Sequence, residues 1–247
     1  MKYTLNELYN GDCMEAMREM PDGFFELAIV DPPYGINAEG GTGKYGKRKF
    51  RSEKAKTWDA GIPPPEYFAE LRRVSQNQII FGGNYFAHLL PPSRCWVAWD
   101  KGAGFYNRNF AECELAWTSF DRNAKVFNYD PLAHRDYVDK IHPCQKPVAV
   151  YTWLLQNFAN AGDKILDTHV GSASSLIACH NCNFDFLGFE KDADIYARAA
   201  QRLEAERAHL RFDVFCGGGG DTVNGIIITA MICLTIIIVC AIGYKKK

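Results

Sequence analysis

The sequence lacks a dominant charge, a recognisable leader and any internal repeat. Its 28 basic and 29 acidic residues leave a net charge of −1, which argues neither for nor against a nucleic-acid partner. No signal peptide is visible and the nine cysteines are scattered, so we expect a reducing compartment, the cytoplasm. With 47% hydrophobic and 23% charged residues, the 247-residue chain is typical of a folded protein with one main domain.

Zinc-type cysteine spacing is also missing. Cys179 and Cys182 form one C-x-x-C pair, but no second pair stands at the spacing that a zinc site requires. Small buried residues on a helix explain these two cysteines better than a redox or metal role does. We therefore predict that the protein binds no metal.

Short apolar runs alternate with helical patterns along the chain. Seven runs are expected to be strands: Leu5–Asn10, Glu26–Val30, Gln78–Phe81, Cys95–Trp99, Leu115–Phe120, Lys164–Asp167 and Phe186–Phe189. Helices are expected at Met14–Met20, Pro65–Val74, Val148–Phe158, Ser174–Cys182 and Ala193–Leu210. The alternation predicts an α/β fold with a doubly wound, mostly parallel seven-stranded sheet. Because no helix separates the fourth and fifth runs, we expect them to form an antiparallel hairpin at one edge.

Two long stretches without periodicity, Asn37–Pro64 and Asp121–His142, are expected to be loops, which at this length are usually functional or disordered. Residues 44–56, here called the basic loop, are rich in positive charge and contain only Glu53 as an opposing residue. The basic loop fits either a solvated flexible segment or a segment that contacts nucleic-acid phosphates. We assign it to nucleic-acid binding through Lys44, Lys47, Arg48, Lys49 and Arg51.

Asp31-Pro32-Pro33-Tyr34 directly follows a predicted strand, and ligands bind at the carboxyl ends of strands in open α/β sheets. The prolines fix the backbone, so that the Asp31 carboxylate and the Pro32 carbonyl can point at one place. Together they can accept both hydrogens of an exocyclic amine and free its lone pair for in-line attack. The Tyr34 ring offers a stacking face for a base. A turn with an acidic helix cap is the alternative.

A glycine-bearing turn follows the predicted strand Lys164–Asp167. Gly171 allows a tight turn, and Ser172 and Ser174 open the next helix, where backbone N–H groups can approach a ligand closely. Glu190 directly follows the next predicted strand, Phe186–Phe189, and can accept both hydroxyl groups of a ribose. These features predict a nucleoside-type cofactor site.

Several ordered motifs resemble those of the N6-adenine/N4-cytosine DNA methyltransferases. They are D-P-P-Y-G-I at 31–36, H-P-C-Q-K-P at 142–147, L-D-T-H-V-G-S-A-S-S at 166–175 and G-F-E-K-D at 188–192. N-G-D-C at 10–13 resembles the cofactor-adenine motif of the permuted group, in which the catalytic motif precedes the cofactor loop. The resemblance covers about residues 3–211.

The resemblance implies a Rossmann-like methyltransferase fold with S-adenosylmethionine as cofactor. The substrate would be double-stranded DNA with the target base flipped out of the duplex, and the catalytic residues would be Asp31, Pro32, Pro33 and Tyr34. The implied cofactor-binding residues are Asp12, Cys13, His142, Gln145, Lys146, Pro147, Asp167, His169, Gly171, Ser172, Ser174 and Glu190. Glu190 would hold the ribose, residues 12–13 would lie near the adenine, and residues 142–147 would line the methionine end. Asp31 favours N6 of adenine, because N4-cytosine enzymes more often carry serine there.

The chain departs from the family pattern at two positions. Ala173 stands where glycine is more frequent, and His169 stands where phenylalanine is common. If position 173 requires a positive φ, an alanine there costs stability. Two further segments, Phe81–Tyr85 and Trp99–Lys101, fit either the wall of a base pocket or ordinary turns with a surface ion pair.

Other activities fit parts of the same pattern. Pro143-Cys144-Gln145 is the nucleophile motif of cytosine-C5 methyltransferases, but it precedes the cofactor loop and no E-N-V follows. We therefore expect no covalent role for Cys144. N4 of cytosine, an amine of RNA or protein, and a non-catalytic membrane-tethered binding module are alternatives that the residues leave open.

The C-terminal tail is apolar. Residues 225–244 read GIIITAMICLTIIIVCAIGY and precede Lys245–Lys247, and the run is long enough to cross a bilayer as a helix. A buried helix or a β-prone tail is the alternative. We predict a methyltransferase domain at 1–213, a glycine-rich linker at 214–224 and, at 225–247, a tail able to contact a membrane and dispensable for folding.

Overall fold

The computed structural model describes residues 2–36, 59–108, 111–138, 140–142 and 144–217. The chain divides into two units, Met1–Leu203 and Glu204–Lys247. The first unit holds the whole sheet. The described part of the second unit is the end of the last helix, α5 (Ala193–Gly217), where Arg207 and Glu204 form an ion pair of 2.5 Å.

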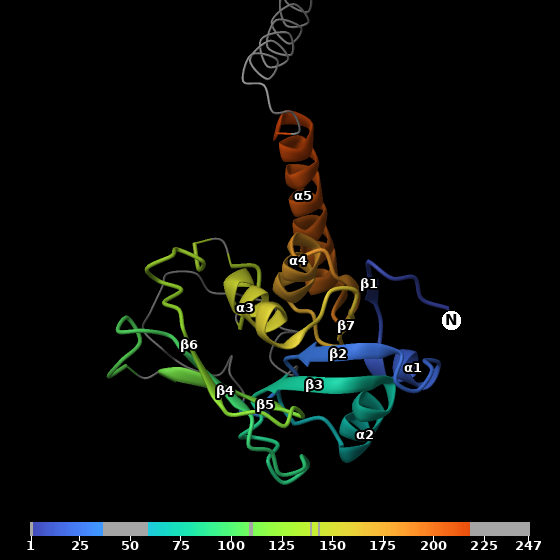
Figure 1. Ribbon diagram of the computed structural model, residues 1–247, viewed down its shortest axis with the longest axis vertical. Coiled ribbons are helices and arrows are strands. Elements are labelled where there is room, and N and C mark those ends of the chain that lie inside the picture. The colour runs from blue at the N-terminus through green and yellow to red at the C-terminus, as the bar shows by residue number, and fades with distance from the viewer. Residues whose placement is uncertain (1, 37–58, 109–110, 139, 143, 218–247) are drawn as a thin grey trace, which may run out of the picture. The chain divides into compact units, whose positions relative to one another are not determined.

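The described residues of the first unit form an α/β structure, with eight strands in one sheet. Figure 1 shows the sheet with helices packed against it. The strands are β1 (Glu7–Asn10), β2 (Phe25–Val30), β3 (Ser75–Phe81), β4 (Trp96–Asp100), β5 (Cys113–Thr118), β6 (Lys125–Asn128), β7 (Lys164–Asp167) and β8 (Asp185–Glu190). The helices that precede α5 are α1 (Cys13–Arg18), α2 (Pro65–Val74), α3 (Val148–Phe158) and α4 (Ser174–Asn181).

The strands lie in the order β1-β8-β7-β2-β3-β5-β4-β6. Only β5 is antiparallel to its two neighbours, and all other neighbouring strands are parallel. From β2 the chain passes through α2 to β3, and from β7 it passes through α4 to β8 on the opposite side. The connections therefore diverge between β2 and β7, and a doubly wound sheet binds its ligands at such a switch point.

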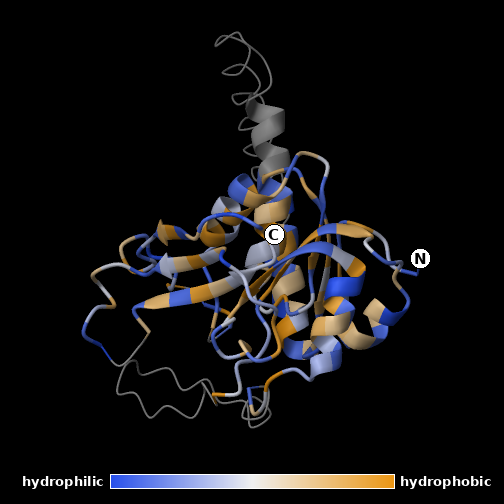
Figure 2. Ribbon diagram, turned by 60° about the horizontal axis from the view of Figure 1, so that its bottom comes forward, coloured by the Kyte–Doolittle hydropathy of each residue, from blue (hydrophilic) through white to orange (hydrophobic). Residues whose placement is uncertain are grey.

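Helices cover both faces of the sheet because successive strand residues point to opposite sides. Leu27 and Ile29 of β2 pack in one core with residues of α3 and α4, whereas Ala28 and Val30 pack in another with residues of α1 and α2. Figure 1 shows α3 and α4 on one side of β2 and β3 and α2 on the other. Hydrophobic residues accordingly follow the central strands in Figure 2.

The predicted α/β class and mostly parallel sheet are confirmed, with eight strands where the sequence predicted seven. The additional strand, β6, lies within the stretch Asp121–His142 that was expected to be a loop. β6 is only four residues long and is largely exposed, with Val126 at 63%. A strand that buries so little has no need of an apolar run, which was the signal used to predict the other strands. The fourth and fifth predicted strands do pair antiparallel, but β6 rather than either of them occupies the edge.

The helix predictions differ from the structure mainly at the ends. Pro65–Val74 and Val148–Phe158 match α2 and α3 at both ends. α5 continues past the expected end at Leu210, because no proline or glycine interrupts the sequence before Gly217.

Within the described residues, no helix has the length and apolar character needed to cross a membrane. The apolar run 225–244 and the basic loop both lie outside the described residues, so their predicted roles are not addressed by the structure.

Candidate active site

Residues at the carboxyl ends of five strands, four of them polar, meet at one edge of the sheet. Asn10, Asp167 and Glu190 end β1, β7 and β8, while Asp31 and Gly82 directly follow β2 and β3. Because these five strands run parallel, their carboxyl ends share an edge. Asp31 and Asp167 stand on the two sides of the switch point between β2 and β7.

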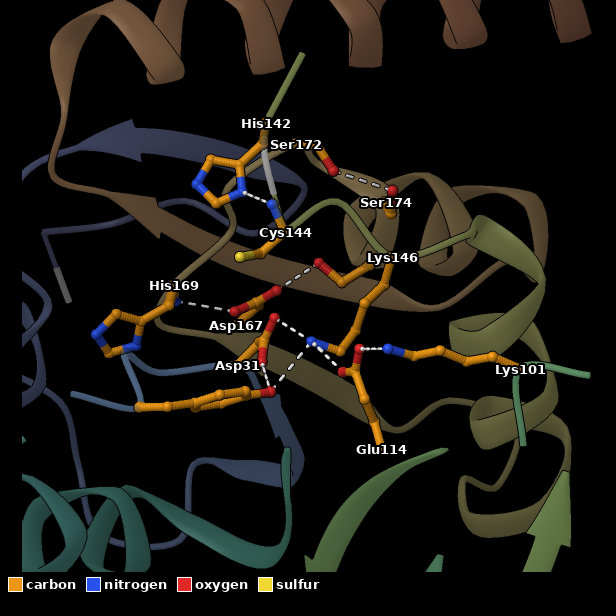
Figure 3. A network of polar contacts seen from close by, with 12 residues as sticks. Asp31, Lys101, Glu114, His142, Cys144, Lys146, Asp167, His169, Ser172 and Ser174 are labelled. Carbon is orange, nitrogen blue, oxygen red and sulfur yellow. Dashed lines mark hydrogen bonds and ion pairs between the residues drawn. The ribbon is translucent and has the colours of Figure 1, made fainter. Parts of the chain in front are cut away.

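Asp31 is a carboxylate enclosed by the protein (Figure 3). The Tyr34 hydroxyl donates a hydrogen bond of 2.6 Å to Asp31 Oδ1, and the Lys146 ammonium group forms an ion pair with Asp31 Oδ2. Burial raises the pKa of the Asp31 carboxyl, and the charge of Lys146 opposes that rise. The ion pair therefore favours the ionised form of Asp31, which is the form that can accept hydrogens from an amine.

Lys146 connects Asp31 to a second, partly buried carboxylate, Glu114, that was not predicted from the sequence. Lys146 Nζ lies 3.1 Å from Glu114 Oε2, and Lys101 Nζ lies 2.7 Å from Glu114 Oε1. Burial disfavours ionisation of Glu114, but the charges of Lys146 and Lys101 outweigh it and lower the Glu114 pKa to about 2. Lys101 is thus part of a buried network rather than of a surface ion pair.

The ring of Tyr34 is fixed by the segment that follows β3. It stacks on Tyr85 with a centroid distance of 4.9 Å and an interplanar angle of 15°. Gly82 has φ +70° and lies so close to the ring that a Cβ atom there would be 2.2 Å from Tyr34 Cε1. The predicted pocket segment Phe81–Tyr85 therefore lies against Tyr34 of the predicted catalytic motif.

The turn after β7 is held by the buried carboxylate of Asp167 and the partly buried carboxylate of Glu190. Asp167 accepts hydrogen bonds from the His169 backbone N–H, at 2.9 Å, and from the Ser175 hydroxyl. Glu190 accepts from the Gly171 backbone N–H through Oε2 at 2.9 Å and from the Asp192 backbone N–H through Oε1 at 2.9 Å. Burial raises the pKa of both carboxyls, that of Asp167 to about 7.

The start of α4 is held in a conformation that alanine adopts with difficulty. Ala173 has φ 64° and ψ 16°, so the position does have the positive φ at which the sequence predicted a cost. Arg202 of α5 stabilises this turn, because its Nη1 donates to the Ser172 carbonyl at 2.7 Å and to the Ser174 hydroxyl at 2.9 Å. The Ser172 and Ser174 hydroxyls also contact each other at 3.1 Å.

Residues 10–13 lie beside the end of β8. The Asn10 side-chain amide donates to the Glu190 carbonyl at 2.8 Å. Asp12 caps α1 by accepting from the Met14 backbone N–H at 2.8 Å, and the hydrogen bond from Lys191, also 2.8 Å, lowers the Asp12 pKa. Cys13 is buried, which raises its pKa to about 12.

The segment before α3 brings residues 142 and 144–147 to the same edge. The Cys144 backbone N–H donates to His142 Nδ1 at 3.2 Å, and Gln145 Oε1 accepts from the Ile141 backbone N–H at 3.1 Å. Burial lowers the pKa of His142 to about 4. Cys144 is exposed at the surface, but desolvation by the neighbouring protein raises the pKa of its thiol to about 11, so the thiol is neutral at physiological pH. Pro147 caps α3.

His169 stands where the family pattern more often has phenylalanine, and its imidazole ring makes polar contacts. Its Nδ1 lies 2.9 Å from the Thr168 hydroxyl, which in turn contacts the Tyr67 hydroxyl at 2.7 Å. Burial lowers the pKa of His169 to about 4, so the imidazole is uncharged near neutral pH. The ring lies at the start of the cofactor turn.

The structure thus brings the predicted catalytic residues and the described members of the predicted cofactor set to one edge of the sheet. The donor set suits a nucleoside cofactor, because Glu190 can accept from ribose hydroxyls and the turn at Gly171 can approach a ligand. Among the described residues, no group of three or more His, Cys, Asp and Glu side chains is arranged to hold a metal ion.

Known proteins match this chain in sequence. The N6/N4 DNA methylase family matches residues 90–202. The type II methyltransferase M.HpaI of Haemophilus parainfluenzae is 32% identical over 242 residues, which cover 79% of this chain and 73% of that protein. The type II methyltransferase M.BglII of Bacillus subtilis is 21% identical over 262 residues, covering 83% of this chain and 71% of that protein.

Solved structures match the fold. The M1.HpyAVI–SAM complex superposes with a TM-score of 0.54 at 17% identity, covering 80% of this chain and 98% of that one. PvuII DNA methyltransferase, which is cytosine-N4-specific, superposes with a TM-score of 0.53 at 11% identity, covering 83% and 91%. At such low identity these two matches establish the fold alone. The similarity to M.HpaI extends over most of both sequences, and this chain therefore belongs to the N6/N4 DNA methylase family.

Proposed function

We propose that this chain transfers the methyl group of S-adenosylmethionine to N6 of adenine in double-stranded DNA. The observation that carries the proposal is the position of Asp31. It is a partly buried carboxylate, 16% exposed, at the carboxyl end of a central strand, across the switch point from the turn between Asp167 and Glu190. That placement suits transfer between a ligand on β7 and β8 and an amine held at β2.

The chain's own residues would prepare the amine for attack. Asp31 and the Pro32 carbonyl would accept its two hydrogens and free the nitrogen lone pair for attack on the methyl carbon. Such preorganised acceptors are typically worth about 10²–10³ in rate. Tyr34 would support the base by stacking, and its hydroxyl already fixes Asp31. S-adenosylmethionine supplies an electrophilic methyl group on a positively charged sulfur.

Adenine is favoured over cytosine by the acidic residue at position 31, where N4-cytosine enzymes more often carry serine. The fold does not separate the two, because a cytosine-N4-specific enzyme superposes on this chain. The target base would have to leave the duplex, since its amine is otherwise engaged in pairing. The basic loop would contact the phosphates.

The proposal is tested by incubating the full chain with duplex DNA and methyl-labelled S-adenosylmethionine and then identifying the methylated nucleoside. We expect N6-methyldeoxyadenosine. The Asp31→Ala variant should lose this product and still bind the cofactor in calorimetry. Parallel reactions with RNA and with protein should remain unlabelled, and label in either one would assign a different substrate.

A further inference from the structure

Two buried lysines and two partly buried carboxylates form a continuous row at this edge of the sheet. Asp31, Lys146, Glu114 and Lys101 alternate in sign, and each contacts the next (Figure 3). The side chains of Lys146 and Lys101 are 3% and 10% exposed, and those of Asp31 and Glu114 are 16% and 21% exposed. Buried charges are costly unless they are paired, so a row of this kind constrains the position of each member.

Lys146 is held by two hydrogen bonds and one ion pair. Its ammonium group donates to Asp31 Oδ2 and to the Tyr34 hydroxyl oxygen at 3.3 Å. It also forms an ion pair of 3.1 Å with Glu114 Oε2, an oxygen that accepts no hydrogen bond from the described residues. Lys101 pairs with the other oxygen of Glu114 at 2.7 Å.

We propose that Lys146 is a positioning residue for methyl transfer, set between Asp31 and Glu114, and that Glu114, with Lys101 behind it, holds Lys146 in place. This inference rests on the proposed function for its catalytic meaning. The network keeps Asp31 ionised and oriented for an incoming amine. Neither Glu114 nor Lys101 lies in a motif on which the family resemblance rests.

The titration of Asp31 follows from its surroundings. Without Lys146, two carboxylates would share one buried site with no cation between them, and like charges in such a site raise a carboxyl pKa strongly. The other ionisable groups around Asp31 are Tyr34, Tyr67, Glu114, Cys144, Tyr151 and Asp167. Of these, only Glu114 shares Lys146 as its ion-pair partner.

A direct test follows the Asp31 carboxyl by NMR in the full chain labelled with carboxyl-¹³C aspartate, with Asp31→Asn to assign the signal. In Lys146→Met, the midpoint of Asp31 should rise by about 1 pH unit or more. In the double variant Glu114→Gln/Lys146→Met it should fall back toward the wild-type value. Glu114→Gln alone retains the cation and removes the like charge, so it should lower the midpoint below that of the wild type.

Methyl transfer provides the second measurement. The acid limb of the kcat–pH profile on duplex DNA should move in the same direction as the Asp31 midpoint in each variant. Lys164→Met is the matched control. Lys164 pairs with Glu26 at 2.9 Å and lies at the amino end of β7, away from the edge that carries Asp31. In this variant the Asp31 midpoint and the acid limb should equal those of the wild type.

The outcomes separate this inference from the proposed function. The inference would be overturned by an unchanged Asp31 midpoint in Lys146→Met. It would also be overturned if the midpoint in Glu114→Gln/Lys146→Met did not fall back toward the wild-type value. Either result would count even if the enzyme methylates DNA. If Lys146→Met does not fold, Lys146→Gln takes its place, and an unchanged Asp31 midpoint in that variant would overturn the inference instead. A wild-type chain that leaves DNA unmethylated would refute the proposed function, while the NMR titration would still decide the role of Lys146.

Discussion

Gly82→Ala perturbs the catalytic motif from outside it. The added Cβ would lie 2.2 Å from Tyr34 Cε1 and 2.5 Å from Tyr34 Cδ1. Non-bonded carbon atoms prefer roughly 3.5–4.0 Å, so the Tyr34 ring would have to move by about 1.3 Å or more. The positive φ of residue 82 adds about 1–2 kcal/mol of backbone strain.

The displacement should act on catalysis more than on cofactor binding. The ring that moves stacks on Tyr85, and its hydroxyl is bonded to Asp31. A misplacement of roughly 1 Å can cost about 10²-fold in rate, so we expect kcat to fall by about two orders of magnitude. The affinity for S-adenosylmethionine should be unchanged, because residues 167–190 are not altered.

Gly23→Ala is the matched control for Gly82→Ala. Gly23 has φ +59°, and the nearest atom to an added Cβ would be Gln76 Cγ at 3.8 Å. The control therefore carries the backbone strain without the collision. Single-turnover methylation, calorimetry with the cofactor and urea unfolding should be measured for both variants. If Gly82→Ala keeps wild-type kcat, the position of the Tyr34 ring is not needed for catalysis and the reasoning fails.

Further predictions concern the cofactor turn, the thiol and the basic loop. Glu190→Gln should weaken S-adenosylmethionine binding by about 1.5–3 kcal/mol in calorimetry, because it removes a charged acceptor; unchanged affinity would remove Glu190 from the site. Burial raises the pKa of Asp167 to about 7, above its unfolded value, so the free energy of unfolding should fall by up to about 4 kcal/mol as the pH rises from about 4 to about 7. Urea titrations should show that Asp167→Asn lacks this fall, and equal pH slopes would contradict it. Cys144→Ser should stay active, because the thiol is neutral; a dead variant with a trapped adduct in the wild type would instead indicate a covalent nucleophile. Alanines at residues 47–49 should reduce the log–log salt slope of DNA binding by up to about three, and an unchanged slope would place the loop away from the phosphates.

The parts of the site that follow parallel strands could be predicted from the sequence. Asp31, Asp167 and Glu190 each stand at the carboxyl end of a short apolar run, and a parallel sheet brings such ends together. Ala173 could also be singled out, because a turn that usually carries glycine predicts a positive φ, which the structure has. In these cases the local sequence pattern is enough to predict where the residue lies or which backbone conformation it adopts.

Glu114 could not be predicted in the same way. It lies at the amino end of β5, which reaches the catalytic edge only because β5 runs antiparallel to β3 and β4. The direction of a strand depends on pairings between distant segments, which a local pattern does not contain.

Contacts between separate loops could not be predicted from the sequence either. The approach of Gly82 to Tyr34 joins segments that follow different strands, and the sequence showed only that each segment ended a strand. The short edge strand β6 was missed because its stability comes from pairing with β4 rather than from an apolar run of its own.

The central claim is that Asp31 directs methylation to the exocyclic amine of adenine. The most direct measurement is nucleoside analysis by mass spectrometry of duplex DNA after reaction with the wild-type chain and, separately, with Asp31→Ala. The account predicts N6-methyldeoxyadenosine from the wild type and none from the variant. N4-methyldeoxycytidine or 5-methyldeoxycytidine as the product, or undiminished N6-methyldeoxyadenosine from Asp31→Ala, would contradict it.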